Sequence, residues 1–148
     1  MEKIEYILKE FDKCDISLSK EQGEKLLKLY DFLVEYNEKV NLTAITDFEE
    51  VVIKHFVDSI LPFSKLRIDK GASFIDVGTG AGFPSIPILI YRPDLEGTLL
   101  EALNKRCVFL EAACELVGVK AKVVHGRAED YAKDKREQFD IATARAVA

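Results

Sequence analysis

The sequence predicts an α/β fold in which an incomplete parallel sheet follows a set of N-terminal helices. The first third of the chain has helical hydrophobic periodicity, whereas from residue 73 onward short strand-like apolar runs alternate with helix-like ones. A glycine-rich turn directly follows the first of these runs. Strands that alternate with helices run parallel and are joined by right-handed crossovers, so these observations indicate an open, doubly wound sheet.

Three helices are predicted in the N-terminal helical region, residues 1–63. The first carries an apolar stripe at i, i+3, i+4 and i+7, formed by Ile4, Ile7, Leu8 and Phe11. The second begins at a capping box, SKEQ, in residues 19–22. The third begins near Thr46 or Asp47, with Glu49 placed to reach back to the cap, and ends at Pro62.

Residues 64–148 are expected to form the first half of a ligand-binding α/β unit, within a single domain overall. Strands are predicted within residues 73–78, 97–103, 121–127 and 139–145, and helices within 83–91, 104–118 and 128–134. Asn104 is the expected cap of the middle helix, and Gly118 its expected C-terminal glycine. The fourth strand would form an apolar exposed edge, which is an aggregation hazard, so we expect the chain to be part of a longer protein.

The composition excludes several classes of protein. The net charge of −5 at pH 7 argues against binding nucleic acid by bulk electrostatics, although it does not exclude a local basic face. No stretch approaches the roughly 18 apolar residues of a membrane span, and no signal-peptide pattern is present, so we expect a cytoplasmic protein. The three cysteines are scattered without the spacing of a metal site, and we expect no metal: Cys14, Cys107 and Cys114.

The turn after the first strand, FIDVGTGAGFP in residues 74–84, has the pattern D-x-G-x-G-x-G. It lacks the Lys-Ser or Lys-Thr of a phosphate-binding P-loop. A dinucleotide fingerprint read from Gly78 would place its third small residue at Phe83, where a bulky ring would crowd the helix–strand contact. Dinucleotide binding is therefore disfavoured but stays open.

The remaining ligand class is a nucleoside with a small polar tail. Glu101 closes the second strand at the distance where an acid accepts hydrogen bonds from ribose hydroxyls. S-adenosylmethionine fits this pattern, because its cationic sulfonium and ammonium groups would also favour the nearby Asp76. The alternative is that the glycines, with Gly80 among them, only form a tight turn and that Glu101 is solvated.

Several segments resemble one known family, in this order: YNEKVNLTAI, KHFVDSI, DVGTGAGFPSIPI, LLEALNKRCVFL, GRAED and TARA. The chain resembles the glucose-inhibited division protein B family, also called ribosomal RNA small subunit methyltransferase G, from about Leu26 onward. The resemblance implies a Rossmann-like, S-adenosylmethionine-dependent methyltransferase fold. It also implies N7 methylation of one guanine in the 530 loop of 16S ribosomal RNA, within the small ribosomal subunit. Family members continue well past the TARA segment.

The resemblance also implies a set of cofactor contacts. By position, the expected cofactor-binding residues are Gly78, Phe83, Glu101, Ala128, Glu129 and Arg145, together with Gly80 and Asp76 of the loop. No catalytic acid or base is expected, because guanine N7 carries a lone pair and no proton. His55, on the apolar face of the third helix, is therefore predicted to be a partly buried packing residue. For His125, the sequence supports two roles equally: packing at the end of a strand, or a position beside the cofactor.

Two other functions stay open from the sequence. The chain could bind S-adenosylmethionine, or only interact with partners, without methylating, or it could be an NAD-dependent oxidoreductase. No membrane or DNA is expected as a partner, and the full-length protein is expected to be a monomer. Residues 37–43, NEKVNLT, could face RNA, although local hydrogen bonding at a helix end would explain them equally well.

Overall fold

The computed structural model describes residues 2–127, 129 and 139–144. Within them lies a four-stranded sheet with the order β3-β2-β1-β4, in which every pairing is parallel. The strands are β1 (Ser73–Val77), β2 (Glu96–Glu101), β3 (Ala121–His125) and β4 (Ile141–Thr143). The order reverses between β1 and β4, as it does in doubly wound sheets. The predicted α/β class is confirmed.

Two helices connect the first three strands. Helix α5 (Ser85–Tyr91) joins β1 to β2, and α6 (Asn104–Val117) joins β2 to β3. Helix α6 ends as predicted at Gly118, whose φ of 71° is left-handed. Its predicted start is wrong by one residue: Leu103 is the N-cap and Asn104 is already helical. The predicted helix within 128–134 lies outside the described residues, apart from Glu129.

The N-terminal helices begin largely as predicted. Helices α1 (Glu2–Asp12) and α2 (Lys20–Asn37) pack against each other. The capping box before α2 is complete: the Gln22 amide donates to Ser19 Oγ at 3.1 Å, and the Ser19 amide donates to Gln22 Oε1 at 2.8 Å.

The third predicted helix consists of three consecutive segments. These are α3 (Phe48–Val51), a π-helical segment η1 (Val52–Val57) and α4 (Asp58–Ser64). Asp47 is the cap, and its carboxylate accepts from the Glu50 amide at 3.2 Å, so Glu50 and not Glu49 occupies the third helical position. The end predicted at Pro62 is also wrong, because α4 continues to Ser64 through short turns that close on the Pro62 and Phe63 carbonyls.

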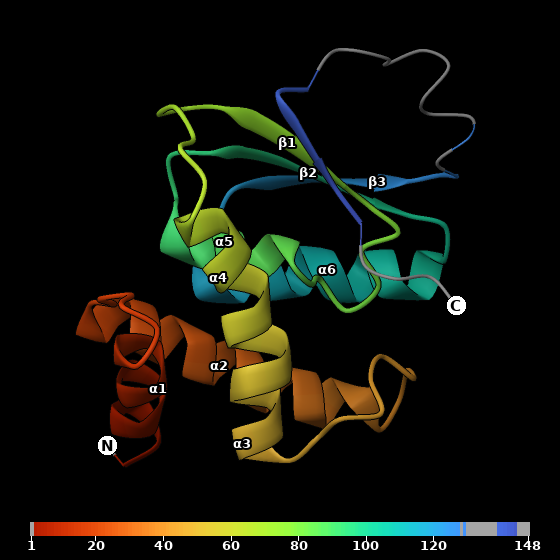
Figure 1. Cartoon of the computed structure of the whole chain (residues 1–148). Coiled ribbons are helices and arrows are strands. Elements are labelled where there is room, and N and C mark those ends of the chain that lie inside the picture. Colours follow the sequence, from red (N-terminus) through yellow and green to blue (C-terminus); the bar gives the residue numbers. More distant parts are fainter. Residues whose placement is uncertain (1, 128, 130–138, 145–148) are drawn as a thin grey trace.

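The helices lie in layers on one side of the sheet. Figure 1 shows α5 and α6 beneath the sheet and α2 passing beneath them, and α2 contacts both. The rings of Phe32 on α2 and Phe109 on α6 stack at 5.3 Å between centroids. One continuous hydrophobic core therefore joins the N-terminal helices to the sheet layer. None of the described helices combines the length and apolarity needed to cross a membrane.

Candidate functional site

The loop after β1 contains three glycines with positive φ: 67° at Gly78, 60° at Gly80 and 91° at Gly82. Such φ values favour glycine, because other residues meet a steric penalty there. The amides of Gly78 and Thr79 both donate to the Leu100 carbonyl on β2, at 2.9 and 3.2 Å. The loop is thus fixed at the carboxyl ends of the two central strands, where open α/β sheets bind ligands.

The same glycines differ in what their missing side chains would meet. A Cβ added at Gly78 or Gly80 would have no heavy atom of the described residues within 4 Å. A Cβ at Gly82 would lie 2.5 Å from Ile86 Cδ1 and 3.1 Å from Leu110 Cδ2. Gly78 and Gly80 therefore leave open space above the loop for a ligand, whereas Gly82 permits close packing beneath it.

Asp76 lies beneath the loop and is fully buried. Its Oδ2 accepts from Thr79 Oγ1 at 2.8 Å and from the Ser85 amide at 3.3 Å, while Oδ1 accepts no hydrogen bond from the described residues. The hydroxyl of Thr143, the register partner of Asp76 on β4, donates to the Ile75 carbonyl at 3.4 Å. This arrangement makes Asp76 a support that shapes the loop from below.

Burial raises the pKa of Asp76, and the hydrogen bonds to its carboxylate only partly oppose that shift. Because the folded-state pKa is raised, the folded protein holds its proton at a pH where the unfolded chain has released it. Ionisation therefore costs stability as the pH rises from the ordinary carboxyl range through the raised pKa, and this cost is absent at lower pH.

We expect the Asp76→Asn variant to lack this loss of stability. The free energy of unfolding of the variant, relative to that of the unmodified protein, should increase as the pH rises through this window and then level off. Denaturant titrations at a series of pH values from about 4 upward measure the difference. A constant difference across the series would show that Asp76 has the same pKa in the folded and unfolded states, and it would contradict the prediction. Asp12→Asn, at an exposed aspartate that ends α1, is the control.

Glu101, the last residue of β2, is almost fully buried beside the loop. Its Oε1 accepts from the Gly80 amide at 2.9 Å, and its Oε2 accepts from the Leu103 amide at 2.9 Å. Each carboxylate oxygen retains a second lone pair for a ligand hydroxyl. Glu101 is thus placed at the end of β2 as the sequence indicates, and it also links the glycine loop to the start of α6.

A cavity of about 170 Å³ opens beside this loop, and we call it the loop cavity. Its lining comes from the glycine loop and from two distant segments: Leu42, Thr43, His55, Gly78, Thr79, Gly80, Ala81 and Phe83. The Phe83 ring stacks on His55 with centroids 4.4 Å apart and planes 8° apart. Thr43 Oγ1 lies 3.0 Å from His55 Nε2. His55 is buried and packed, as the sequence indicates, but it also forms part of the cavity wall.

The remaining predicted site residues are less clearly placed. Glu129 is exposed beyond the end of β3, while Ala128 and Arg145 lie outside the described residues. His125 Nε2 lies 2.9 Å from the Ala102 carbonyl, so it ties the end of β3 to the residue after Glu101. Leu42 and Thr43 were not predicted beside the cofactor, although residues 37–43 were considered as a segment that could face RNA. The only signal that could have found them is that NEKVNLT and KHFVDS both belong to the segments that carry the family resemblance.

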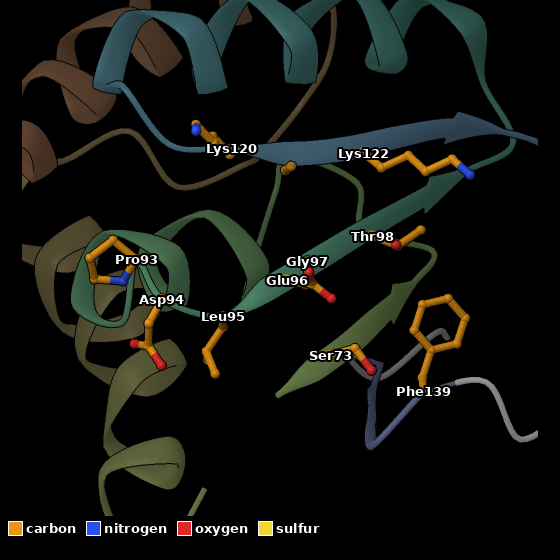
Figure 2. A pocket seen from close by; sticks show the side chains of 11 residues that line it. Ser73, Pro93, Asp94, Leu95, Glu96, Gly97, Thr98, Lys120, Lys122 and Phe139 are labelled. Atoms are coloured by element: carbon orange, nitrogen blue, oxygen red, sulfur yellow. The ribbon is translucent and has the colours of Figure 1, made fainter. Parts of the chain in front are cut away.

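A larger cavity, of about 680 Å³, lies at the opposite ends of the strands. We call it the amino-end cavity, because the first residues of β1, β2 and β3 line it: Ser73, Glu96 and Ala121. Figure 2 shows Lys120 and Lys122 on its β3 side and Glu96 on β2. Ligands of doubly wound sheets bind at the carboxyl ends, so size alone does not make this cavity the site.

A parallel doubly wound sheet with an open glycine loop and a buried acid at the end of β2 defines the class of Rossmann-like proteins that bind a nucleoside cofactor. The chain belongs to the GidB family, described as rRNA small subunit methyltransferase G, whose model matches residues 22–148. This confirms the family resemblance seen in the sequence. Membership implies S-adenosylmethionine as the methyl donor, and the open space at Gly78 and Gly80 beside Glu101 fits such a nucleoside.

Similar proteins carry the same name. A ribosomal RNA small subunit methyltransferase G of Clostridium beijerinckii is 54% identical over 136 residues, which are 90% of this chain and 57% of that protein. One of Clostridium perfringens is 48% identical over 151 residues, covering 100% of this chain and 63% of that protein. The chain thus spans about six tenths of the length of these relatives.

One solved structure also matches in part. The precorrin-6y C5,15-methyltransferase of Geobacter metallireducens is 22% identical, with a TM-score of 0.44. The match covers 51% of this chain and 40% of that one.

Proposed function

We propose that this chain forms the cofactor-binding part of a methyltransferase that modifies N7 of one guanine in the 530 loop of 16S ribosomal RNA. The observation that carries the proposal is the glycine loop, which has open space at Gly78 and Gly80 and is held by Glu101 at the carboxyl ends of the strands. Family membership supports the reaction class and the RNA substrate.

The proposed binding mode uses the described site residues in distinct roles. Glu101 accepts hydrogen bonds from the ribose hydroxyls through the lone pairs that the backbone amides leave open. The backbone of Gly78 and Gly80 permits the close approach of the nucleoside. Phe83 provides an apolar wall, and Asp76 holds the loop in the cofactor-binding shape from beneath, through Thr79 and Ser85. By family position, Ala128, Glu129 and Arg145 complete the contacts.

The chemistry requires positioning more than proton transfer. When bound, S-adenosylmethionine supplies an electrophilic methyl group on a sulfonium centre. Guanine N7 offers a lone pair, so the residues around the cavity need not remove a proton. Holding the nucleophile in line can lower the barrier by several kcal/mol, on the order of 7 to 11 in favourable cases. His55, which is stacked on Phe83 and bonded to Thr43, is accordingly assigned to the wall and not to general-base catalysis.

The organisation of the full-length protein is also part of the proposal. Residues 1–63 form a helical region and residues 64–148 the first half of the cofactor-binding unit, within one domain; the shared hydrophobic core supports this. The partner is the small ribosomal subunit, and the protein acts in the cytoplasm as a monomer.

Two measurements test the proposal. Calorimetric titration with S-adenosylhomocysteine should show binding, whereas tight binding of NAD alone would favour an oxidoreductase. Incubation of the complete gene product with labelled S-adenosylmethionine and small subunits that lack the modification should yield N7-methylguanosine in 16S ribosomal RNA. Binding of S-adenosylhomocysteine without methyl transfer would identify a binding module and contradict the enzyme assignment.

A further inference from the structure

A third cavity, of about 480 Å³, lies next to the glycine-loop side of the molecule. One wall is formed by residues 39–41, which follow α2, and the other by residues 103–106, at the start of α6. We call it the cationic groove, because it contains Lys39, Lys105 and Arg106 and none of the described residues that line it is acidic. Across it, Arg106 Nη2 lies 3.5 Å from the Asn41 carbonyl.

The cationic groove adjoins the loop cavity along both of its walls. On the α2 side, residues 39–41 line the groove and the next two, Leu42 and Thr43, line the loop cavity. Asn37 fixes this segment: its Oδ1 accepts from the Leu42 and Thr43 amides at 2.8 and 3.0 Å, and its Nδ2 donates to the Thr43 carbonyl at 3.1 Å.

On the α6 side, a single carboxylate connects the two cavities. Glu101 accepts from Gly80 in the loop cavity and from Leu103 in the groove. A polymer lying in the groove would therefore pass directly beside the place where the methyl group is transferred.

The charge of the groove contrasts with that of the whole chain. Three cationic side chains gather there in a sequence with a net charge of −5. The groove also contains the N-terminal end of α6, where Leu103 provides no side-chain cap and the helix dipole adds partial positive charge. The amino-end cavity differs, because Asp94 and Glu96 accompany its two lysines. The cationic groove thus suits a polyanion, and Leu103, which is 53% exposed, adds an apolar contact within it.

We propose that the cationic groove binds the phosphate backbone of the RNA nucleotides next to the methylated guanine, with Leu103 against a ribose or base. This inference rests on the proposed function, because it assumes an RNA substrate at the loop cavity. Lys39 and Lys105 act as phosphate contacts, which position the RNA without reading its sequence. Arg106 holds the two walls and adds its charge.

The test compares two pairs of exposed lysines in the complete gene product. The Lys39→Gln/Lys105→Gln variant removes two charges from the groove, and Lys120→Gln/Lys122→Gln removes two from the amino-end cavity. Binding of a 530-loop RNA hairpin is measured by fluorescence anisotropy at several salt concentrations. The groove variant should bind on the order of tenfold more weakly, and its salt dependence should be shallower by about 1.4 in log–log slope. The control variant should bind like the unmodified protein.

Two further measurements show whether any loss of RNA binding is specific to the charge of the groove. Affinity for S-adenosylhomocysteine should be unchanged in both variants, and Lys39→Arg/Lys105→Arg should restore RNA binding. Equal losses in both lysine pairs, or no loss in the groove pair, would overturn the proposal. The proposal would also be overturned if the Lys39→Gln/Lys105→Gln variant kept its affinity for RNA but lost affinity for an acidic peptide. Each of these outcomes would overturn the groove proposal without contradicting the proposed function. Absence of methyl transfer by the unmodified protein would contradict the proposed function, and binding of the RNA hairpin would still test the groove.

Discussion

The Gly82→Ala variant is expected to lose about 3 kcal/mol of its free energy of unfolding. The added methyl group would lie 2.5 Å from Ile86 Cδ1 and 3.1 Å from Leu110 Cδ2, distances that require the α5 and α6 side chains to shift. In addition, the φ of 91° at this position is one that alanine rarely adopts. Strain and overpacking therefore act together at the point where the loop meets the core. Denaturant titration followed by circular dichroism measures the loss.

Gly80→Ala is the matched comparison, because it changes the same residue type two positions away. Its φ of 60° is close to the left-handed helical value, and its Cβ would meet no described atom within 4 Å. We expect a cost of about 1 kcal/mol in stability. The new methyl group would instead occupy the open space above the loop and weaken the binding of S-adenosylhomocysteine. Equal destabilisation by the two variants would contradict the distinction between a packing glycine and a ligand-facing one.

This distinction marks a limit of the sequence. The spacing D-x-G-x-G-x-G predicts a loop with unusual backbone angles, and all three glycines have them. It does not show that Gly82 faces Ile86 and Leu110, because that contact depends on how α5 and α6 pack against the loop. The capping box before α2 and the glycine after α6 were predictable, because each depends only on residues that are close together in the sequence.

The predictions were wrong where contacts from other parts of the fold outweighed a local sequence signal. Asn104 is a better capping residue than Leu103 by propensity, yet the Leu103 amide is held by Glu101 and the helix begins one residue earlier than the cap assignment predicts. The π-helical segment η1 has no pattern that separates it from a regular helix, but it places His55 against Phe83.

The distant wall of the loop cavity shows the same limit. Thr43, His55 and Phe83 are brought together by tertiary packing across 40 residues of sequence, which periodicity cannot reveal. The position of Glu101 at the end of β2 could be predicted from the sequence, because a strand end is a local feature. Its hydrogen bonds to two backbone amides could not be predicted.

The Glu101→Gln variant is expected to bind S-adenosylhomocysteine roughly thirtyfold more weakly, a loss of about 2 kcal/mol. A carboxylate can accept hydrogen bonds from two backbone amides and two ribose hydroxyls at once, whereas the glutamine amide group has only one acceptor oxygen. Its NH₂ would face either the Gly80 or the Leu103 amide, donor against donor. The loop and the start of α6 would then separate slightly, so both the ribose contact and the loop geometry are lost. Isothermal titration calorimetry measures the affinity.

Glu96→Gln provides the control, because it makes the same substitution at the other end of the same strand, where the glutamate is exposed. It should leave the affinity unchanged. Stability separates the two contributions of Glu101: loss of one amide bond should cost about 1 kcal/mol, less than the loss in binding. If Glu101→Gln loses stability but binds S-adenosylhomocysteine as tightly as the unmodified protein, the carboxylate serves only to join the loop to α6. A loss in binding that exceeds the loss in stability is the result expected if the carboxylate contacts the ligand in addition to joining the loop to α6.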